Sequence, residues 1–273
     1  AVRAARRAGD IIVRSLNRMS SIQVDAKAHN ELVTEVDRAA ENEIIETIRK
    51  SYPDHSFLGE ETGSHGHSDF QWIIDPLDGT TNFVHGYPQF AVSIALRQRG
   101  RLEHGVIYDP MRQELFTASR GTGAQLDGRR IRVSARRDLT GALIGTGFPY
   151  RANAVWMDEY LQMMKAVTES VAGIRRPGAA ALDLAYVAAG RFDGFWELGL
   201  AEWDLSAGVL LVREAGGLVS LADQWSGTSN TARFAILLAA LLVLEVGLRR
   251  TAVKDLLHLR GLEGLLGCHR GID

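Results

Sequence analysis

The sequence has very little cysteine, little net charge and no long apolar run. Its one cysteine, Cys268, excludes an internal disulfide framework and is typical of a reducing compartment such as the cytoplasm. Lys and Arg total 31 against 33 Asp and Glu, which argues against a global basic field for binding nucleic acid. The longest apolar run, Ala235–Leu244, is too short for a membrane span, which needs about 20 such residues.

The first half combines two helices with a group of strands. Apolar residues at helical spacing predict a helix over 2–16, and a second helix is expected to begin near Thr34 and to stop before Pro53. Because the chain opens inside the first helix rather than on Met, we expect residues to be missing before Ala1. An antiparallel meander is predicted from the strand patterns at Gln71–Asp75, Phe90–Gln98, Leu102–Tyr108 and Glu114–Ser119.

The second half alternates helical and strand patterns, which predicts an α/β unit. The expected helices cover Ala154–Val171, Ala180–Ala189 and Asp204–Ala215, and the expected strands cover Phe192–Leu198 and Leu218–Leu221. We place a division near Leu139, after the basic stretch Arg129–Arg137. The fold class is therefore mixed α/β, with an α+β part over 1–139 and an α/β part over 140–273.

The densest chemical signal is Trp72–Phe83, which reads WIIDPLDGTTNF. An apolar strand runs into Asp75 and Asp78, Pro76 lacks the N–H that a ladder needs, and Gly79 permits a tight turn. Both carboxylates are expected at the end of a strand, where open α/β sheets bind ligands. Carboxylates this close repel unless a cation neutralises them, and oxygen ligands favour Mg²⁺, Mn²⁺ or Ca²⁺ over zinc. A plain Asp-Gly turn is the alternative interpretation.

Further acidic positions extend this pattern. Glu60 and Glu61 follow the apolar segment Phe57–Gly59, Asp204 opens a predicted helix, and Asp37 lies early in another. Each alone is also explained as a solvated pair, an N-cap or a partner of the helix dipole. Together they suit two divalent ions that clamp the entering and leaving oxygens of a phosphoester displacement. Such a reaction needs no Ser, Cys or His nucleophile.

These motifs resemble the inositol monophosphatase family, within the lithium-sensitive, metal-dependent phosphatase superfamily. The resemblance covers about residues 1–220 and is carried by Asn30–Asp37, Gly59–Glu61, Trp72–Phe83, Trp203–Asp204 and Glu214–Gly217. Bisphosphatases and nucleotide phosphatases share the Asp-Pro-x-Asp-Gly-Thr string, whereas Thr81–Phe83 favours the monophosphatase branch. Phe90–Ala95 and Ala181–Gly190 are similar to the bacterial members.

The resemblance implies a layered αβαβα sandwich, a homodimer without a membrane segment, inhibition by lithium, and Mg²⁺-dependent hydrolysis of a small phosphomonoester such as myo-inositol 1-phosphate. It implies two or three Mg²⁺ per site. The first would be held by Glu60, Asp75 and the Leu77 carbonyl, the second by Asp75, Asp78 and Asp204, and a weaker third by Glu60 and water.

The resemblance also implies the remaining roles. Thr80 and Asp37 would form a hydrogen-bonded pair that helps Glu60 orient the attacking water. The backbone N–H groups of Gly79 and Thr80 would meet the phosphate. The polyol hydroxyls would be bound by Asp78, Gly178, Ala180 and Glu197.

Two positions depart from the family pattern. Glu31 stands where Asp is usual and keeps the charge, whereas Ala179 stands where Ser or Thr is usual and removes a hydroxyl near the polyol. The substrate is therefore less certain than the chemistry. Alternative functions are a related nucleotide or sugar bisphosphatase, a non-catalytic partner of the transcription antitermination machinery, and an inactive product with an incomplete fold.

Three other signals have simpler interpretations. His65 and His67 lie in a polar segment that reads as a flexible loop, and Gly121–Gly123 lacks the third glycine of a dinucleotide loop. The basic stretch Arg129–Arg137 reads as a solvated edge strand, with an RNA or protein contact as the alternative.

The resemblance stops near residue 220, where a Leu/Arg-rich stretch replaces the family's Asp-rich turn, glycine-rich loop, strand and closing helix. The abrupt change indicates a shifted reading frame or a replaced terminus, with an ordinary divergent C-terminus as the alternative. We expect the α/β half to lack its final strand and helix, with Phe234–Leu248 a helix over part of the exposed surface. Residues beyond about Ser226 are expected to be poorly ordered and to associate through Ala235–Leu244.

Overall fold

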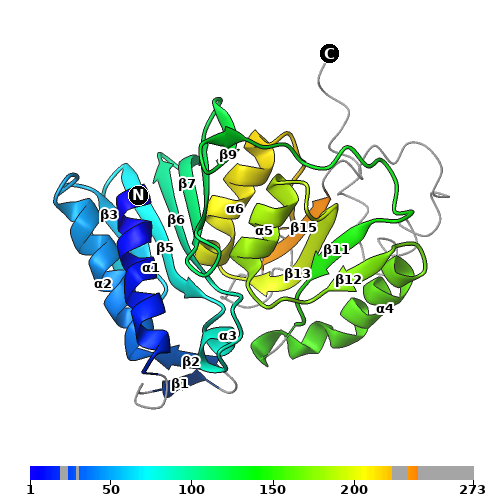
Figure 1. Ribbon diagram of the computed structural model, residues 1–273, viewed down its shortest axis with the longest axis horizontal. Helices are drawn as coiled ribbons and strands as arrows, with labels where there is room; N and C mark the ends of the chain where they lie inside the picture. Colours follow the sequence, from blue (N-terminus) through cyan, green and yellow to red (C-terminus); the bar gives the residue numbers. More distant parts are fainter. Residues whose placement is uncertain (19–23, 29–30, 150, 223–232, 239–273) are drawn as a thin grey trace.

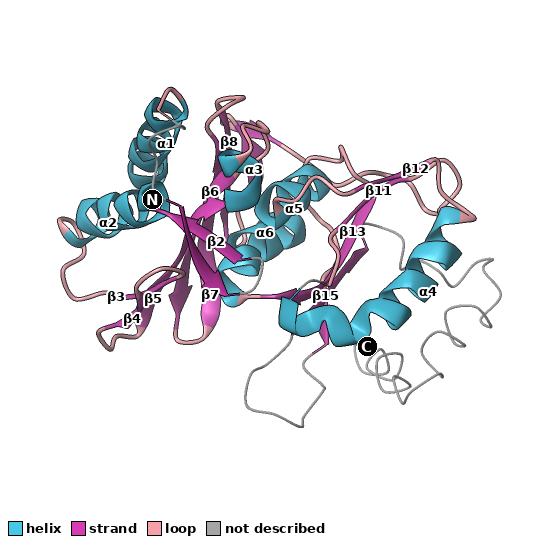
Figure 2. Cartoon of the chain, turned by 90° about the horizontal axis from the view of Figure 1, so that it is seen from below, coloured by secondary structure: helices cyan, strands magenta, loops and turns pink. Residues whose placement is uncertain are grey.

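Helices and sheets alternate in layers. The computed structural model describes residues 1–18, 24–28, 31–149, 151–222 and 233–238. Figure 1 shows α1 (Val2–Leu16) and α2 (Glu35–Arg49) on one face of an eight-stranded sheet, and α5 (Ala180–Ala188) and α6 (Glu202–Glu214) between that sheet and a five-stranded one. Figure 2 shows α4 (Met157–Thr168) on the outer side of the second sheet. The expected αβαβα arrangement is confirmed.

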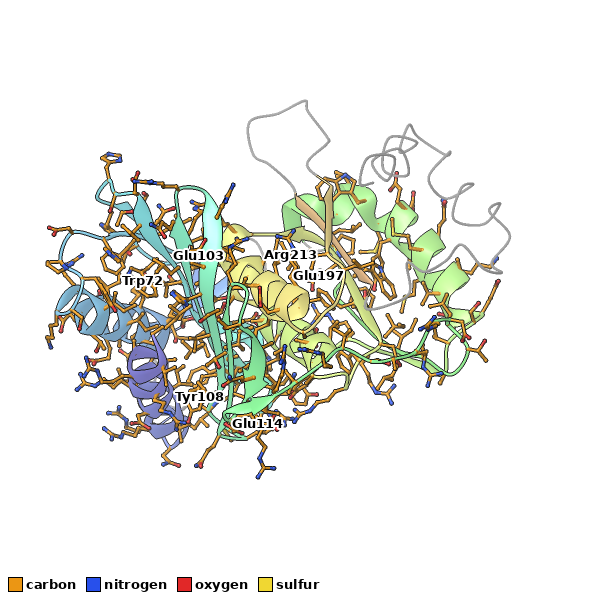
Figure 3. The ribbon with its side chains drawn as sticks, turned by 90° about the horizontal axis from the view of Figure 1, so that it is seen from above. Trp72, Glu103, Tyr108, Glu114, Glu197 and Arg213 are labelled. Atoms are coloured by element: carbon orange, nitrogen blue, oxygen red, sulfur yellow. The ribbon has the colours of Figure 1, made fainter. Side chains whose placement is uncertain are left out.

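The eight-stranded sheet contains the predicted meander. Its spatial order is β10-β9-β8-β7-β6-β5-β3-β4, and β3 runs parallel to β5. In chain order the strands are β3 (Ser56–Gly59), β4 (Gly63–His65), β5 (Phe70–Asp78), β6 (Ala91–Gln98), β7 (Arg101–Asp109), β8 (Glu114–Ser119), β9 (Gly123–Leu126) and β10 (Arg129–Arg130). Side chains alternate between its faces, as Ile73 packs with α5 and α6 whereas Trp72 and Ile74 pack with α1 and α2. In Figure 3, Trp72 and Tyr108 lie on this second face.

The second sheet has the order β12-β11-β13-β15-β14. Its strands are β11 (Leu143–Thr146), β12 (Gly173–Arg175), β13 (Gly194–Leu200), β14 (Ser220–Ala222) and β15 (Arg233–Leu238). β11 pairs in parallel with β12 and β13, whereas β15 is antiparallel to both of its neighbours. The sequence patterns did not predict β11 or β12, because strands this short show little periodicity.

Short elements complete the described chain. β1 (Val24–Ala28) and β2 (Glu31–Thr34) form a separate antiparallel pair, α3 (Thr80–Val84) follows β5, and the 3₁₀ helix η2 (Arg151–Trp156) precedes α4. The predicted cap of α2 is confirmed, since the Thr34 hydroxyl accepts from Val36 N at 3.1 Å and the Asp37 carboxylate accepts from Thr34 N at 2.8 Å. Within the described residues, no helix is long and apolar enough to cross a membrane.

Two expectations drawn from the sequence patterns are wrong. The apolar segment that begins at Phe234 was expected to be helical, but residues 233–238 form β15, which hydrogen-bonds to β13 and β14. The second sheet therefore does not lack a strand at this position. Poor order was expected beyond about Ser226, and residues 233–238 differ from this because they form a strand. Residues 223–232 and 239–273, with the rest of the apolar run up to Leu244, lie outside the described residues. His65 lies in edge strand β4 rather than in a loop.

The basic stretch begins as expected, because Arg129 and Arg130 form β10 at the opposite edge of the first sheet. The division near Leu139 stays a prediction. One buried cluster joins both sheets through α5 and α6, as it contains Ile73 and Ile107 of the first sheet together with Phe195 of the second.

Helices α5 and α6 pack closely because Gly208 has no side chain. A Cβ at Gly208 would lie 2.4 Å from Leu184 Cδ1 and 2.5 Å from Leu184 Cβ. We predict that Gly208→Ala lowers the free energy of unfolding by about 1–3 kcal/mol, although alanine favours a helix by about 1 kcal/mol. Urea unfolding measures the change. Gly173→Ala is the control, because a Cβ there would meet only the flexible end of Arg175, at 3.2 Å, and Leu143 Cδ1 at 3.6 Å. An equal loss of stability in both variants would contradict the close packing at Gly208.

Candidate active site

Strand β5 ends in the two acidic residues of the densest motif. Asp75 is buried, and its Oδ1 accepts a hydrogen bond from Leu77 N at 3.0 Å. The pairing of β5 with β6 shifts register between Asp75 and Asp78, so the strand bends where Pro76 interrupts the ladder. Gly79 then adopts a left-handed conformation with φ 93°, and a Cβ there would lie 2.9 Å from Gln89 O.

Glu60 lies beside Asp75 because β3 and β5 are parallel. Their register pairs Gly59 with Ile74, and Glu60 N continues the ladder by donating to Ile74 O at 3.1 Å. The side chains of Glu60 and Asp75 form a hydrogen bond between two carboxyl groups. This contact contributes to the raised pKa of Asp75.

Asp204 reaches the same place from the start of α6. It is the third residue of the helix, and its Oδ2 accepts from Ala201 N at 2.7 Å. Strand β6 holds this helix start, since the Ser93 hydroxyl donates to Trp203 O at 3.3 Å. The sequence interpretation of Asp204 as the opening of a helix is confirmed by α6.

The electrostatic environment of Asp75 shows that three other acidic side chains lie near it. Burial raises the pKa of Asp75 well above its usual value, and the neighbouring charges of Glu60, Asp78 and Asp204 raise it further. Burial also raises the pKa of Asp78 to about 7, although backbone N–H groups of α5 lower it. The four carboxyl groups are therefore ionised together only when a positive charge lies between them.

Asp78 connects this cluster to the second half of the chain. Its Oδ2 accepts from Ala181 N at 2.7 Å, at the first turn of α5. The charge of Glu197, which β13 carries and Figure 3 labels, contributes to the raised pKa of Asp78. A Cβ at Gly147 would lie 1.9 Å from the Glu197 carboxyl carbon, so only glycine leaves room for this side chain. Gly178 and Ala180 flank the N-cap of α5.

Asp37 and Thr80 are in contact, as the sequence comparison with the family implied. The Thr80 hydroxyl lies 2.9 Å from Asp37 Oδ1 and 3.1 Å from the Leu77 carbonyl oxygen, so it donates its one proton to either acceptor. Asp37 is buried, and burial raises its pKa against the hydrogen bonds from Thr34 and Thr80. The part that this pair takes in a reaction stays a prediction.

The sequence analysis placed Asn82 in the family motif but predicted no role for its side chain. Its Nδ2 donates to Gln89 O at 2.7 Å, to Pro177 O at 2.9 Å and approaches Gly178 O at 3.2 Å. Asn82 therefore ties α3 to the loop that leads into α5. The motif contained this residue, but nothing in the sequence shows which distant carbonyls it meets.

Asp183 was also missed as an acidic neighbour of the site. It is buried within α5, and its Oδ1 has no hydrogen-bond partner among the described residues. Burial raises its pKa well above the usual value, and the charges of Glu197 and Asp78 add to this effect. The signal available in the sequence was an aspartate between Leu182 and Leu184 in an apolar helix.

The donor set fits a hard divalent cation, because it consists of carboxyl oxygens with a backbone carbonyl at Leu77 nearby. Across the part of the chain that the structure describes, no three His, Cys, Asp or Glu side chains are arranged as a ready-made metal site. Asp75 accepts from Leu77 N and contacts the Glu60 side chain.

Three further sequence signals lie on other elements. His65 lies on edge strand β4, and the Gly121–Gly123 turn is held by Glu214, whose carboxylate accepts from both glycine N–H groups at 2.8 Å. A turn filled by a side chain in this way does not cradle a phosphate. Glu31 lies in β2.

Comparisons with known proteins agree with this geometry. The model of the inositol monophosphatase family matches residues 1–247. A relative from Pseudomonas aeruginosa described as Nus factor SuhB is 60% identical over 225 residues, or 81% of this chain and 83% of the relative. The solved structure of the extragenic suppressor protein suhB from Bartonella henselae is 47% identical with a TM-score of 0.80, covering 86% of this chain and 91% of that one. Inositol monophosphatase from Anabaena sp. PCC 7120 is 39% identical with a TM-score of 0.72, covering 88% and 89%.

We predict that Asn82→Ala loosens the loop before α5. The substitution leaves the Gln89 and Pro177 carbonyls without their donor, which costs about 1–3 kcal/mol for each carbonyl that stays away from water. Amide hydrogen exchange over residues 176–182 should become faster than in the wild type. Thr81→Ala, at the exposed neighbouring position, is the control. Equal rates of amide exchange over residues 176–182 in the wild type and Asn82→Ala would contradict the role of Asn82 in holding this loop.

Proposed function

Because the chain belongs to the inositol monophosphatase family, we propose that it is a Mg²⁺-dependent phosphatase that hydrolyses a small phosphomonoester, with myo-inositol 1-phosphate as the favoured substrate. The observation that carries the proposal is the convergence of Glu60, Asp78 and Asp204 on buried Asp75. Buried carboxylates at this density are typical of a site that functions with bound divalent cations.

The proposed ligands divide between two ions and a weaker third. Glu60, Asp75 and the Leu77 carbonyl would hold the first, Asp75, Asp78 and Asp204 the second, and Glu60 with water the third. When bound, Mg²⁺ supplies positive charge for the phosphate oxygens and makes a water molecule a better nucleophile. Asp75 belongs to both proposed sets because the charges of Glu60, Asp78 and Asp204 all act on its carboxyl group.

Thr80 and Asp37 would help Glu60 orient the attacking water. The Thr80 hydroxyl has one proton and two acceptors in reach, Asp37 Oδ1 and the Leu77 carbonyl. If the Leu77 carbonyl were a cation ligand, Asp37 would be the better acceptor for the Thr80 proton. The Thr80 oxygen then presents its lone pairs to a water proton, while the Glu60 carboxylate accepts the other.

The phosphate would lie at the start of α3, against the backbone N–H groups of Gly79 and Thr80. The left-handed Gly79 turn gives this close approach, because a side chain there would meet Gln89 O and Ala179. The polyol hydroxyls would be bound by Asp78, Glu197 and the backbone of Gly178 and Ala180. Ala179 offers them no hydroxyl, so a panel of polyol, nucleotide and sugar phosphates is needed to separate the favoured substrate from a bisphosphate.

We propose that the active form is a cytoplasmic homodimer, on the strength of the family resemblance and the single cysteine. A second candidate function is a contact with the transcription antitermination machinery, supported by the 60% identity to a relative described as a Nus factor. Variants that lack metal ligands would separate the two functions, because they would lose hydrolysis and keep a role that depends on protein contact alone.

A phosphate-release assay with purified protein tests the main proposal. Release from myo-inositol 1-phosphate should require Mg²⁺ and stop with excess EDTA. No release from any phosphomonoester in the panel, from a folded protein in millimolar Mg²⁺, would show that this chain is not a phosphatase.

We predict that Asp78→Asn abolishes hydrolysis and keeps the fold. The amide retains an oxygen for Ala181 N but loses the negative charge that a cation needs. Losing about 3 kcal/mol or more of transition-state stabilisation lowers kcat at least a hundredfold. Asp69→Asn, which removes an exposed partner of Arg99, is the matched control. Near-normal turnover by a folded Asp78→Asn protein would overturn the ligand assignment.

Lithium should inhibit at millimolar concentration, because a small monovalent cation competes for the second, Asp204-containing set of oxygen ligands. Phosphate release is measured against added LiCl, with NaCl at equal ionic strength as the control. Identical curves for the two salts would contradict this description of the site.

A further inference from the structure

Helix α2 carries two buried acidic side chains one turn apart. Asp37 and Glu41 are separated by four residues, so both lie on the same face of the helix. Asp37 contacts Thr80, as described above. Glu41 is fully buried, and neither the family motifs nor the proposed reaction gives it a role.

Both oxygens of Glu41 bind the turn after β3. Oε2 accepts from Glu61 N at 2.9 Å, and Oε1 accepts from Thr62 N at 2.9 Å. The fit is close, because a Cβ at Gly59 would lie 2.5 Å from the Glu41 carboxyl carbon. Gly59 is therefore required by the carboxylate of a residue 18 positions away rather than by its own backbone angles.

These contacts surround Glu60. The N–H of Glu60 donates to Ile74 O on β5, and the next two N–H groups donate to Glu41 on α2. The backbone of Glu60 is thus held on one side by the strand that carries Asp75 and on the other by α2. Because the Glu60 and Asp75 side chains are in hydrogen-bond contact, a shift of this turn changes their separation directly.

We propose that Glu41 is a positioning residue that sets the separation of Glu60 and Asp75, and thereby the affinity of the site for divalent cations. This inference rests on the proposed function for the identity of the two carboxylates as ligands. Partners in the outer shell of a metal site commonly change metal affinity about tenfold to a hundredfold when removed. Glu41 would act in this way through backbone N–H groups rather than through the ligand side chain.

A role in folding alone makes a different prediction. Glu41 could serve only to satisfy the N–H groups of the turn, in which case its loss would lower stability and leave the folded fraction with normal cation affinity. Glu41→Gln distinguishes the two roles, since the amide keeps the size of the side chain but offers one acceptor oxygen to two donors. Glu41→Asp keeps both oxygens on a shorter side chain.

The test is direct binding of Mn²⁺ by isothermal titration calorimetry, with phosphate release against Mg²⁺ concentration as the second readout. We expect Glu41→Gln to bind Mn²⁺ about tenfold or more weakly and to need correspondingly more Mg²⁺. Its KM for the phosphomonoester at saturating Mg²⁺ should match the wild type, and Glu41→Asp should recover part of the affinity. Glu46→Gln, at an exposed position of the same helix, is the control and should match the wild type.

A second variant covers the case in which Glu41→Gln does not fold. Gly59→Ala keeps every polar group and displaces the Glu41 carboxylate by contact, so it should weaken Mn²⁺ binding in the same direction. If both variants fold, their effects should be less than additive, because they disturb one contact. Mn²⁺ affinity equal to the wild type in the folded fraction of either variant would overturn the proposal.

The outcomes also separate this inference from the proposed function. A wild-type protein that binds Mn²⁺ but releases no phosphate would refute the phosphatase and leave the Glu41 comparison valid. A wild-type phosphatase whose Glu41→Gln variant binds Mn²⁺ normally would refute the role of Glu41 alone.

Discussion

Mutual repulsion among buried carboxylates is the constraint on which the rest of the site depends. Asp75 is almost fully buried, and three other acidic residues oppose its ionisation. Three of these carboxylates each accept a hydrogen bond from a backbone N–H: Asp75 from Leu77, Asp78 from Ala181 and Asp204 from Ala201. Fixed dipoles of this kind limit the cost of placing negative charge in the interior, and they keep the side chains close before any cation arrives.

The same constraint explains why distant segments must meet. Asp75 and Asp78 lie at the end of one strand, but Asp78 is held by α5, Asp204 comes from α6, and the turn that carries Glu60 is bound by Glu41 of α2. Asn82 adds a contact from α3 to the loop before α5. The helix layer between the two sheets is therefore part of the site as well as of the core. Small residues such as Gly208 allow α5 and α6 to approach closely enough for this layer to serve both.

The sequence predicted the parts of the site whose signal is local. An apolar strand that ends in Asp-Pro-x-Asp-Gly specifies a bend with two acids at the strand end, and the structure has that bend at the end of β5. Glu41 looks like an ordinary residue of its helix, and although Asn82 lies in the motif and Asp183 interrupts an apolar helix, neither sequence signal shows the neighbours that tertiary packing gives these residues. Residues 233–238 were read as helical for a related reason: an apolar run has no clear period, and pairing with β13 and β14 decides its conformation.

The place of β15 has a consequence for biosynthesis. It lies between β13 and β14 although it follows both in the chain. While the chain emerges from the ribosome, β13 has β11 on one side and an open edge on the other until residues 233–238 leave the exit tunnel. The edge of β13 thus stays unpaired in the nascent chain until β15 is made, whereas strands β5 to β9 of the first sheet pair with neighbours that follow soon in the chain. A chaperone that shields strand edges would act on this interval, after the first sheet has formed and before the second has closed.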